Sequence, residues 1–181
     1  HLSFTGSVGV GKLVQTAAAQ NIVPVTLELG GKSPQVVFED ADLEKALPFL
    51  VNAGIQNAGQ TCSASSRILV HESHYDELCT HMAAAYDGLK VGPATDDLNV
   101  GPLISARQKE IVEGFLAMTD ENHILSRGRI VEDAPKGGHY VAPTLISGVG
   151  PDHSLSQDEI FGPVQVIIPF RDEDHAVEIA N

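Results

Sequence analysis

Cys62 lies in a run of small and polar residues, Asn57 to Arg67, that contains no bulky apolar side chain. A structural cysteine normally lies among large apolar residues, where it behaves as a small hydrophobic side chain. Cys62 is surrounded instead by glycine, alanine, serine, threonine and glutamine, so a substrate can approach its sulfur. This setting predicts a nucleophilic thiol. The second cysteine, Cys79, lies next to Leu78 in an amphipathic helical pattern, which predicts a role in packing.

A carboxylate, Glu28, precedes the cysteine loop in a Glu-Leu-Gly-Gly-Lys-Ser-Pro turn that ends at Pro34. Apolar residues at 25, 27 and 29 alternate with polar ones at 26 and 28, so Glu28 should face away from the apolar side of a strand. Spacing alone favours an ordinary solvent-facing residue. A carboxylate can also accept a proton from water, which is the chemistry needed to hydrolyse a thioester. The thiol and the carboxylate are therefore the candidate nucleophile and base.

A glycine turn followed by a helix occurs near the start of the chain, at Gly6 to Leu13. It nearly satisfies the Gly-x-x-x-x-Gly-Lys-Ser/Thr pattern of a P-loop, but Leu13 cannot supply the hydroxyl that holds Mg²⁺. The Gly-x-Gly-x-x-Gly dinucleotide spacing also fails, since position 14 is valine. The free N–H groups at the start of a helix still favour a phosphate or pyrophosphate. A P-loop-like nucleotide-binding protein is therefore one alternative function.

Four segments resemble signatures of the aldehyde dehydrogenase superfamily, and along the chain they follow the order that the family has. Leu27 to Pro34 resembles the segment with the base, and Gly59 to Cys62 resembles the segment with the nucleophile. Phe4 to Ser7 is similar to the start of the cofactor loop, and Glu159 to Val164 is similar to the segment that contacts the nicotinamide ribose. Short motifs recur by chance, but the order and chemical compatibility of all four make coincidence improbable.

The resemblance implies NAD(P)-dependent oxidation of an aldehyde to a carboxylic acid. Cys62 would form a thiohemiacetal and then a thioester, and Glu28 would act as the base for hydrolysis. The backbone N–H of Cys62 would be one oxyanion donor. Family members that transfer the acyl group to coenzyme A usually lack this glutamate, so the product would be a free acid. A non-catalytic relative is a further alternative, which the presence of both residues disfavours.

The resemblance also implies the cofactor site, with NAD or NADP as the cofactor. Gly6 and Ser7 would face the pyrophosphate, and Gly11 would allow close helix packing. The remaining implied cofactor residues are Leu29, Glu159 and Phe161. From the residues alone, Glu159 and Phe161 would more often be a capped turn and a core side chain.

Strands alternate with helices along the chain, which predicts an α/β fold with a largely parallel sheet flanked by helices. Strands are expected at 2–5, 24–29, 36–38, 67–71, 124–125, 129–131, 140–146 and 164–170; helices are expected at 10–20, 43–54, 75–89, 105–118 and from 172; turns are expected at 6–9 and 136–139. The resemblance places residues 1–29 in a remnant of a Rossmann-type nucleotide-binding domain and 30–181 in a C-terminally truncated catalytic domain. It also places a second oxyanion donor, an asparagine, before His1. The fragment alone is therefore expected to be inactive.

Composition excludes several other classes of protein. Eleven Lys and Arg against 24 Asp and Glu give a formal net charge of -13, which argues against binding to a nucleic acid backbone. No apolar run approaches the roughly 20 residues that span a bilayer, so no membrane partner is expected. Two cysteines cannot form a dense disulfide framework, and a thiol nucleophile needs reducing surroundings, so a cytoplasmic location is expected.

The eight histidines include His71 and His74, but their spacing lacks a third ligand and no metal is assigned. By resemblance, the parent protein would be a homo-dimer or homo-tetramer.

Overall fold

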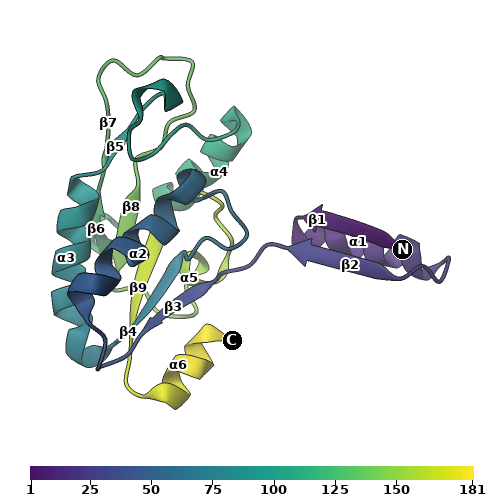
Figure 1. Ribbon diagram of the computed structural model, residues 1–181, viewed down its shortest axis with the longest axis horizontal. Helices are drawn as coiled ribbons and strands as arrows, with labels where there is room; N and C mark the ends of the chain where they lie inside the picture. The colour runs from purple at the N-terminus through teal and green to yellow at the C-terminus, as the bar shows by residue number, and fades with distance from the viewer. The chain divides into compact units, whose positions relative to one another are not determined.

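The computed structural model describes all residues 1–181, which divide into two compact units, His1–Gly31 and Lys32–Asn181. Figure 1 shows that the first unit is a strand, helix, strand element and that the second is a sheet with helices packed on it. No helix is both long enough and apolar enough to cross a membrane.

The first unit is a βαβ element. Strands β1 (Leu2–Gly6) and β2 (Val25–Leu29) pair in parallel, and helix α1 (Val8–Ala19) connects them. The register pairs Thr5 with Glu28 and Gly6 with Leu29. Along β2, half-buried residues alternate with exposed ones, and Glu28 is exposed as expected.

The start of α1 differs from the expectation from sequence. Ser7 is the N-cap, since its hydroxyl accepts a hydrogen bond of 3.4 Å from the backbone N–H of Val10. A capping serine satisfies one of the free N–H groups in the first turn and so allows the helix to begin at Val8. The predicted turn over Gly6 to Gly9 and the predicted helix start at Val10 are therefore wrong.

The second unit is built on a five-stranded sheet with the order β3-β4-β9-β8-β6. Its strands are β3 (Pro34–Val37), β4 (Arg67–His71), β9 (Val164–Phe170), β8 (Thr144–Ser147) and β6 (Ile124–Arg127). The first four run in parallel, and β6 is antiparallel to β8. A separate two-stranded parallel sheet joins β5 (Lys90–Val91) to β7 (Arg129–Ile130). The predicted α/β fold with a largely parallel sheet is confirmed.

Helices α2 (Leu43–Ile55) and α3 (Tyr75–Asp87) pack against each other and against the sheet, and Figure 1 shows them on the same side of it. The helix α6 (Glu173–Ala180) contacts β4 and β9. Two further helices, α4 (Ala106–Ala117) and α5 (Ser154–Gln157), flank the segments that lead into β6 and β9. Asp42 caps α2 and Ser105 caps α4, so short polar side chains determine where both helices begin.

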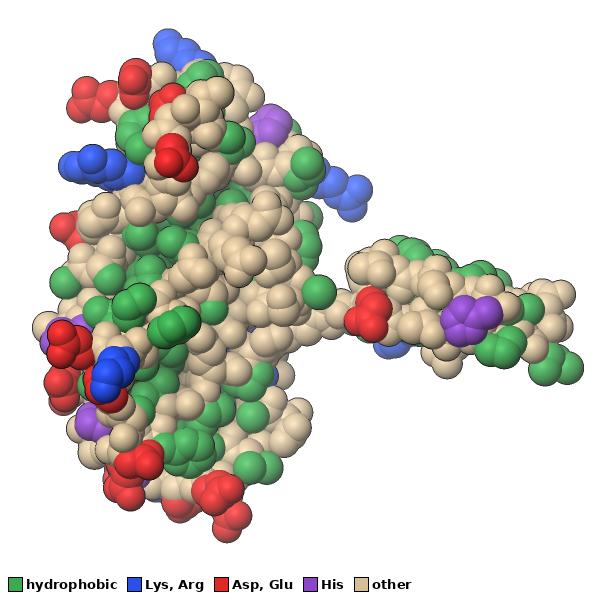
Figure 2. Space-filling view, viewed as in Figure 1, with side chains coloured by type: hydrophobic (Ala, Val, Ile, Leu, Met, Phe, Trp, Pro, Cys, Tyr) green, Lys and Arg blue, Asp and Glu red, His purple; other side chains and the backbone are tan.

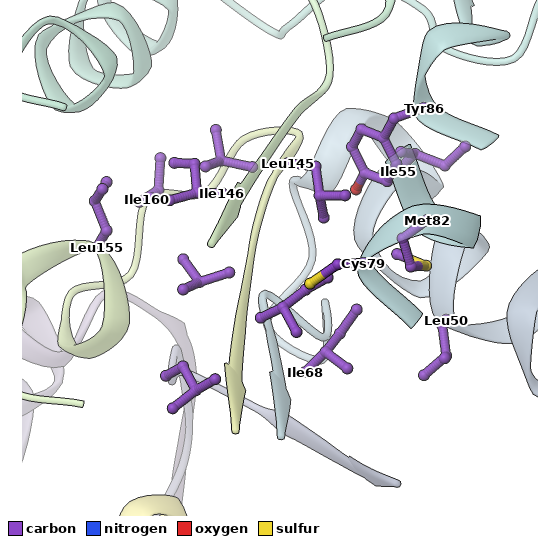
Figure 3. Close-up of a cluster of buried hydrophobic side chains, with 14 of the residues drawn as sticks. Leu50, Ile55, Ile68, Cys79, Met82, Tyr86, Leu145, Ile146, Leu155 and Ile160 are labelled. Carbon is purple, nitrogen blue, oxygen red and sulfur yellow. The ribbon is translucent and has the colours of Figure 1, made fainter. Parts of the chain in front are cut away.

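One hydrophobic core fills the second unit, between the sheet and its helices. Figure 3 shows part of it, with Ile68 and Leu145 of the sheet on the side of Met82 and Tyr86, and with Ile146 beside Leu155 and Ile160. Cys79 lies in this core with 8% of its surface exposed, which confirms its predicted packing role. On the face seen in Figure 2, acidic side chains line the margins of this unit, in keeping with the net charge.

Several element boundaries were predicted incorrectly. The segment 140–143 is not a strand, because β8 begins only at Thr144. The helix over 75–89 ends at Asp87, and Lys90–Val91 forms the short strand β5. The short helix α5 was not predicted, since four residues do not give a period that can be recognised.

Candidate active site

The topology of the sheet brings two of the predicted functional segments to the same edge. The Cys62 loop leads into β4, and the segment Glu159–Phe161 leads into β9. Strands β4 and β9 are adjacent and parallel, with Arg67 paired to Val166. The residues before them therefore meet at the amino ends of the two strands, which is opposite to the carboxyl-end crevice at which open α/β sheets usually bind ligands.

The Cys62 loop begins with a left-handed turn. Asn57, Ala58 and Gly59 all have positive φ angles, of 50°, 54° and 72°. Left-handed backbone costs a non-glycine residue roughly 1 kcal/mol or more, so two such residues in a row require support from their surroundings. Ala58 and Gly59 are buried, whereas Cys62 is exposed with a free thiol. The turn therefore redirects the chain from the end of α2 toward a surface at which the sulfur is accessible.

Side-chain hydrogen bonds hold the beginning of this loop. The Asn57 Nδ2 donates to the carbonyl of Gln60, and the Gln60 Nε2 donates to the carbonyl of Asn57. The Gln60 Oε1 accepts a hydrogen bond of 3.0 Å from the backbone N–H of Ile104. Gln60 therefore joins the left-handed turn to the segment that precedes α4. Sequence reasoning did not assign a role to either amide side chain.

The Cys62 loop is in direct backbone contact with Gly162, the residue that follows the Glu159–Phe161 segment. A Cβ added at Gly59 would overlap the carbonyl group of Gly162, so only glycine fits here. Phe161, next to Gly162, also has a positive φ of 55°. The structure thus brings Cys62 and Glu159–Phe161 into one region through two tightly packed glycines.

Gln108 on α4 holds the Glu159–Phe161 segment from its other side. Its Nε2 donates hydrogen bonds of 3.0 Å to the carbonyls of both Ile160 and Phe161. These two bonds satisfy backbone acceptors that are not part of the sheet, which stabilises the unusual backbone at Phe161. Sequence analysis predicted only a helix over 105–118 and gave no signal for this contact.

Unpaired buried charge characterises the region around Lys32 and Glu159. The Lys32 Nζ and the Glu159 Oε1 are buried and neither has a hydrogen-bond partner. Burial lowers the pKa of Lys32 to about 8; the charge of Arg67 adds to this effect, and the carboxylates of Asp158 and Glu159 oppose it. Native proteins contain few such atoms, and each one calls for a physical reason. The free Glu159 oxygen is an acceptor to which a hydroxyl could donate.

Arg67 fixes the backbone beside Lys32. Its guanidinium is buried and donates to the carbonyl of Lys32 at 2.8 Å, and to those of Ile179 and Ala180 at 2.9 and 3.0 Å. Burial also lowers the pKa of this guanidinium. The three bonds link the first residue of the second unit to the end of α6. An arginine that opens an otherwise apolar strand was the available sequence signal for this role.

The other predicted residues lie in the first unit, around the carboxyl ends of β1 and β2. Glu28 and Gly6 occupy neighbouring strands, and Ser7 follows Gly6 as the cap of α1. Gly11 is buried, and a Cβ added there would lie 2.6 Å from the Leu29 Cδ2. Leu29 therefore packs over the helix at Gly11. These contacts place a carboxylate and a helix N-terminus at one end of the βαβ element.

The structure contradicts the P-loop alternative. A P-loop needs a non-helical loop over the six residues that precede its lysine. Helix α1 begins at Val8, so four of the six corresponding residues here are helical, and Lys12 is an exposed residue within the helix. Nowhere in the structure do three or more His, Cys, Asp or Glu residues form a group that could hold a metal ion.

Comparisons with known proteins agree with this geometry. The sequence model of the aldehyde dehydrogenase family matches residues 1–181. A mitochondrial aldehyde dehydrogenase of Leishmania tarentolae is 42% identical over 185 residues, which cover 99% of this chain and 36% of that protein.

Solved structures give the same result. A protein from Burkholderia cenocepacia assigned as an aldehyde dehydrogenase has a TM-score of 0.96 and 53% identity, over 99% of this chain and 38% of that one. The betaine aldehyde dehydrogenase of Staphylococcus aureus, solved in complex with NAD+, has a TM-score of 0.92 and 35% identity, over 99% of this chain and 37% of that one. This chain thus spans little more than a third of the length of these relatives. The match over its whole length, together with the Cys62 and Glu159–Phe161 segments at one sheet edge, shows that the chain belongs to the aldehyde dehydrogenase family.

Proposed function

We propose that this chain supplies the nucleophile and the base of a longer NAD(P)-dependent aldehyde dehydrogenase that produces a free carboxylic acid. The observation that supports this most strongly is the exposed thiol of Cys62, on a loop in backbone contact with Gly162, directly after the Glu159–Phe161 segment. In this proposal residues 1–29 are the end of the nucleotide-binding domain and residues 30–181 belong to the catalytic domain. The 181 residues alone are proposed to be inactive, since they span so little of the relatives' length.

The first half of the reaction is assigned to Cys62. Its thiolate attacks the aldehyde carbon, and the carbonyl oxygen becomes an oxyanion that accepts a hydrogen bond from the backbone N–H of Cys62. When bound, the nicotinamide cofactor supplies the acceptor for the hydride that leaves this carbon. The thiohemiacetal on Cys62 thereby becomes a thioester. A sulfur atom suits both halves of the reaction, because it is a good nucleophile and a good leaving group.

Glu28 is assigned to the second half. Its carboxylate accepts a proton from a water molecule whose oxygen attacks the thioester carbon. The carbon–sulfur bond then breaks, which releases the acid and regenerates the Cys62 thiolate. The exposure of Glu28 on β2 leaves its carboxylate accessible to water, which is what this role requires.

The residues proposed to hold the cofactor have suitable chemistry. The Glu159 Oε1 is a buried acceptor that lacks a donor, as expected for a group that binds a ribose hydroxyl. Phe161 has 37% of its surface exposed and can pack beside a nicotinamide ring. Gly6, Ser7 and the first turn of α1 would face the pyrophosphate, with Leu29 and Gly11 keeping helix and strand close. NAD or NADP is the proposed cofactor, and two related proteins were solved in complex with NAD+.

The test uses the full-length protein that carries this sequence, with an aldehyde and NAD+ or NADP+. Cys62→Ser is expected to abolish aldehyde oxidation, while the matched variant Cys79→Ser, at the buried thiol, retains it. Glu28→Gln is expected to slow acyl release more than acyl formation, so that a burst precedes a slow steady state. Glu110→Gln, at an exposed carboxylate on α4, is the control for loss of charge. Oxidation by Cys62→Ser at the wild-type rate would refute the proposal.

Two further properties are proposed with this function. The free thiol of Cys62 must stay reduced, which favours a reducing compartment such as the cytoplasm. The full-length protein is proposed to form a homo-dimer or homo-tetramer, as its family resemblance implies. Analytical ultracentrifugation of that protein would test the oligomeric state, and fractionation of cells would test the location.

A further inference from the structure

Gln165 is a polar side chain within an otherwise apolar strand. It lies in β9 with none of its surface exposed, between Val164 and Val166, which are also fully buried. Burial of an amide is costly unless its donors and acceptor are all paired. A hydrophobic residue would suit this position better if packing were the only requirement. The amide therefore calls for a reason beyond core packing.

The amide of Gln165 is fully paired, and its partners come from two helices and the Cys62 loop. The Nε2 donates to the carbonyl of Leu50 on α2 at 3.0 Å and to the carbonyl of Ser65 at 2.6 Å. The Oε1 accepts a hydrogen bond of 2.6 Å from the hydroxyl of Tyr86 on α3. Burial raises the pKa of Tyr86, so this hydroxyl retains its proton and remains a donor. Figure 3 shows Tyr86 within the hydrophobic cluster.

A glycine on α2 leaves space for this amide. A Cβ added at Gly54 would overlap the carboxamide of Gln165, so the glycine provides the space through which Gln165 reaches Leu50. Gly54 lies in the last turn of α2, directly before its final residue Ile55. A side chain at this position would displace the amide.

Ser65 connects this network to the nucleophile. Its carbonyl accepts from Gln165, and its N–H donates to the carbonyl of Ala53 on α2 at 3.1 Å. The next residue, Ser66, accepts a hydrogen bond from the N–H of Val166. Cys62 lies three residues before Ser65, and Gln60 holds the opposite end of the same loop. Gln165 therefore holds the end of the loop that leads into β4.

We propose that Gln165 is a positioning residue for Cys62, which sets the backbone of the nucleophile loop through its hydrogen bond to Ser65. This inference rests on the proposed role of Cys62 as nucleophile. Tyr86 orients the amide by binding its oxygen, so that both hydrogens of the Nε2 are directed at carbonyl groups. The physical reason for a buried glutamine here is that no apolar side chain can donate to the Ser65 carbonyl.

Two variants that differ only in the amide test the proposal. Tyr86→Phe removes the hydroxyl but leaves both Nε2 donors, and Tyr86→Phe with Gln165→Met removes the amide as well without leaving an unpaired tyrosine hydroxyl. Hydrogen exchange of the amides at 61–66 is expected to be at least tenfold faster in the double variant than in Tyr86→Phe. Exchange in α4, distant in sequence from the network, serves as the internal control for overall stability.

Kinetics of the full-length protein provide the functional measurement. The double variant is expected to lower kcat at least tenfold relative to Tyr86→Phe, with less than a twofold change in KM for the dinucleotide. Equal loop exchange in the two variants would overturn the proposal, and so would faster loop exchange with unchanged kcat. If the double variant does not fold, Gln165→Glu takes its place, because a buried carboxyl keeps the size of the amide but offers one donor at most in place of two. Failure of the proposed function would appear separately, as activity retained by Cys62→Ser.

Discussion

Replacement of Lys32 by methionine should change how the stability of the protein depends on pH. The Lys32 Nζ is buried without a hydrogen-bond partner, and burial lowers the pKa of this group from 10.5 to about 8. A base with a lowered pKa in the folded state binds fewer protons there than in the unfolded chain. Between pH 8 and 10.5 the unfolded state therefore holds more protons, and the contribution of Lys32 to stability rises with pH.

The size of the effect follows from the two pKa values. Each unit of difference between folded and unfolded pKa is worth about 1.4 kcal/mol. A fall from 10.5 to about 8 therefore means that Lys32 lowers the free energy of unfolding by roughly 3 kcal/mol at pH 7, which is its penalty. By pH 10 the same two values leave a penalty of about 1 kcal/mol. Lys32→Met removes the penalty. The difference in unfolding free energy between variant and wild type should therefore shrink by about 2 kcal/mol from pH 7 to pH 10.

Urea unfolding at pH 7, 8, 9 and 10, followed by circular dichroism, measures this difference. A comparison of variant with wild type is needed because burial raises the pKa values of Tyr75, Cys79 and Tyr86, and these groups lower stability as pH rises. Their contributions cancel between the two proteins. Lys136→Met, at an exposed side chain that takes part in no ion pair, is the control for loss of a positive charge. A pH-independent difference for Lys32→Met would refute the reasoning.

Two other predictions concern the Cys62 loop and its contacts. Gly59→Ala should destabilise the protein by more than about 2 kcal/mol in urea unfolding, because it adds the cost of left-handed backbone to an overlap with Gly162. The control is Gly114→Ala, where an added Cβ meets nothing within 4 Å; it should stabilise α4 by about 1 kcal/mol. Iodoacetamide should alkylate Cys62 at least 100-fold faster than Cys79 at pH 7, because Cys79 is buried and burial raises its pKa. Trypsin separates the two thiols into different peptides for mass spectrometry, and similar rates would contradict the exposure described for Cys62.

Much of the fold could be predicted because its signals are local. The alternation of apolar and polar residues in β2 and the continuous apolar run of β9 reflect which faces those strands bury. The loop of small residues around Cys62 predicted an accessible thiol, and the structure confirms that Cys62 is exposed. Errors occurred where a single side chain decides a boundary, as when the Ser7 hydroxyl allows α1 to begin at Val8.

The sequence by itself determined the types of chemical group, their order and the elements that would carry them. Only the tertiary structure decided which of these groups meet. Gly59 lies 103 positions before Gly162, and Gln165 lies 100 positions after Ser65, yet both pairs are in contact. Such contacts depend on the pairing of β4 with β9, which arises because burial of many apolar side chains together outweighs the preferences of any one segment. For the same reason an amide in an apolar strand could be noticed in the sequence, but its partners became known only from the folded chain.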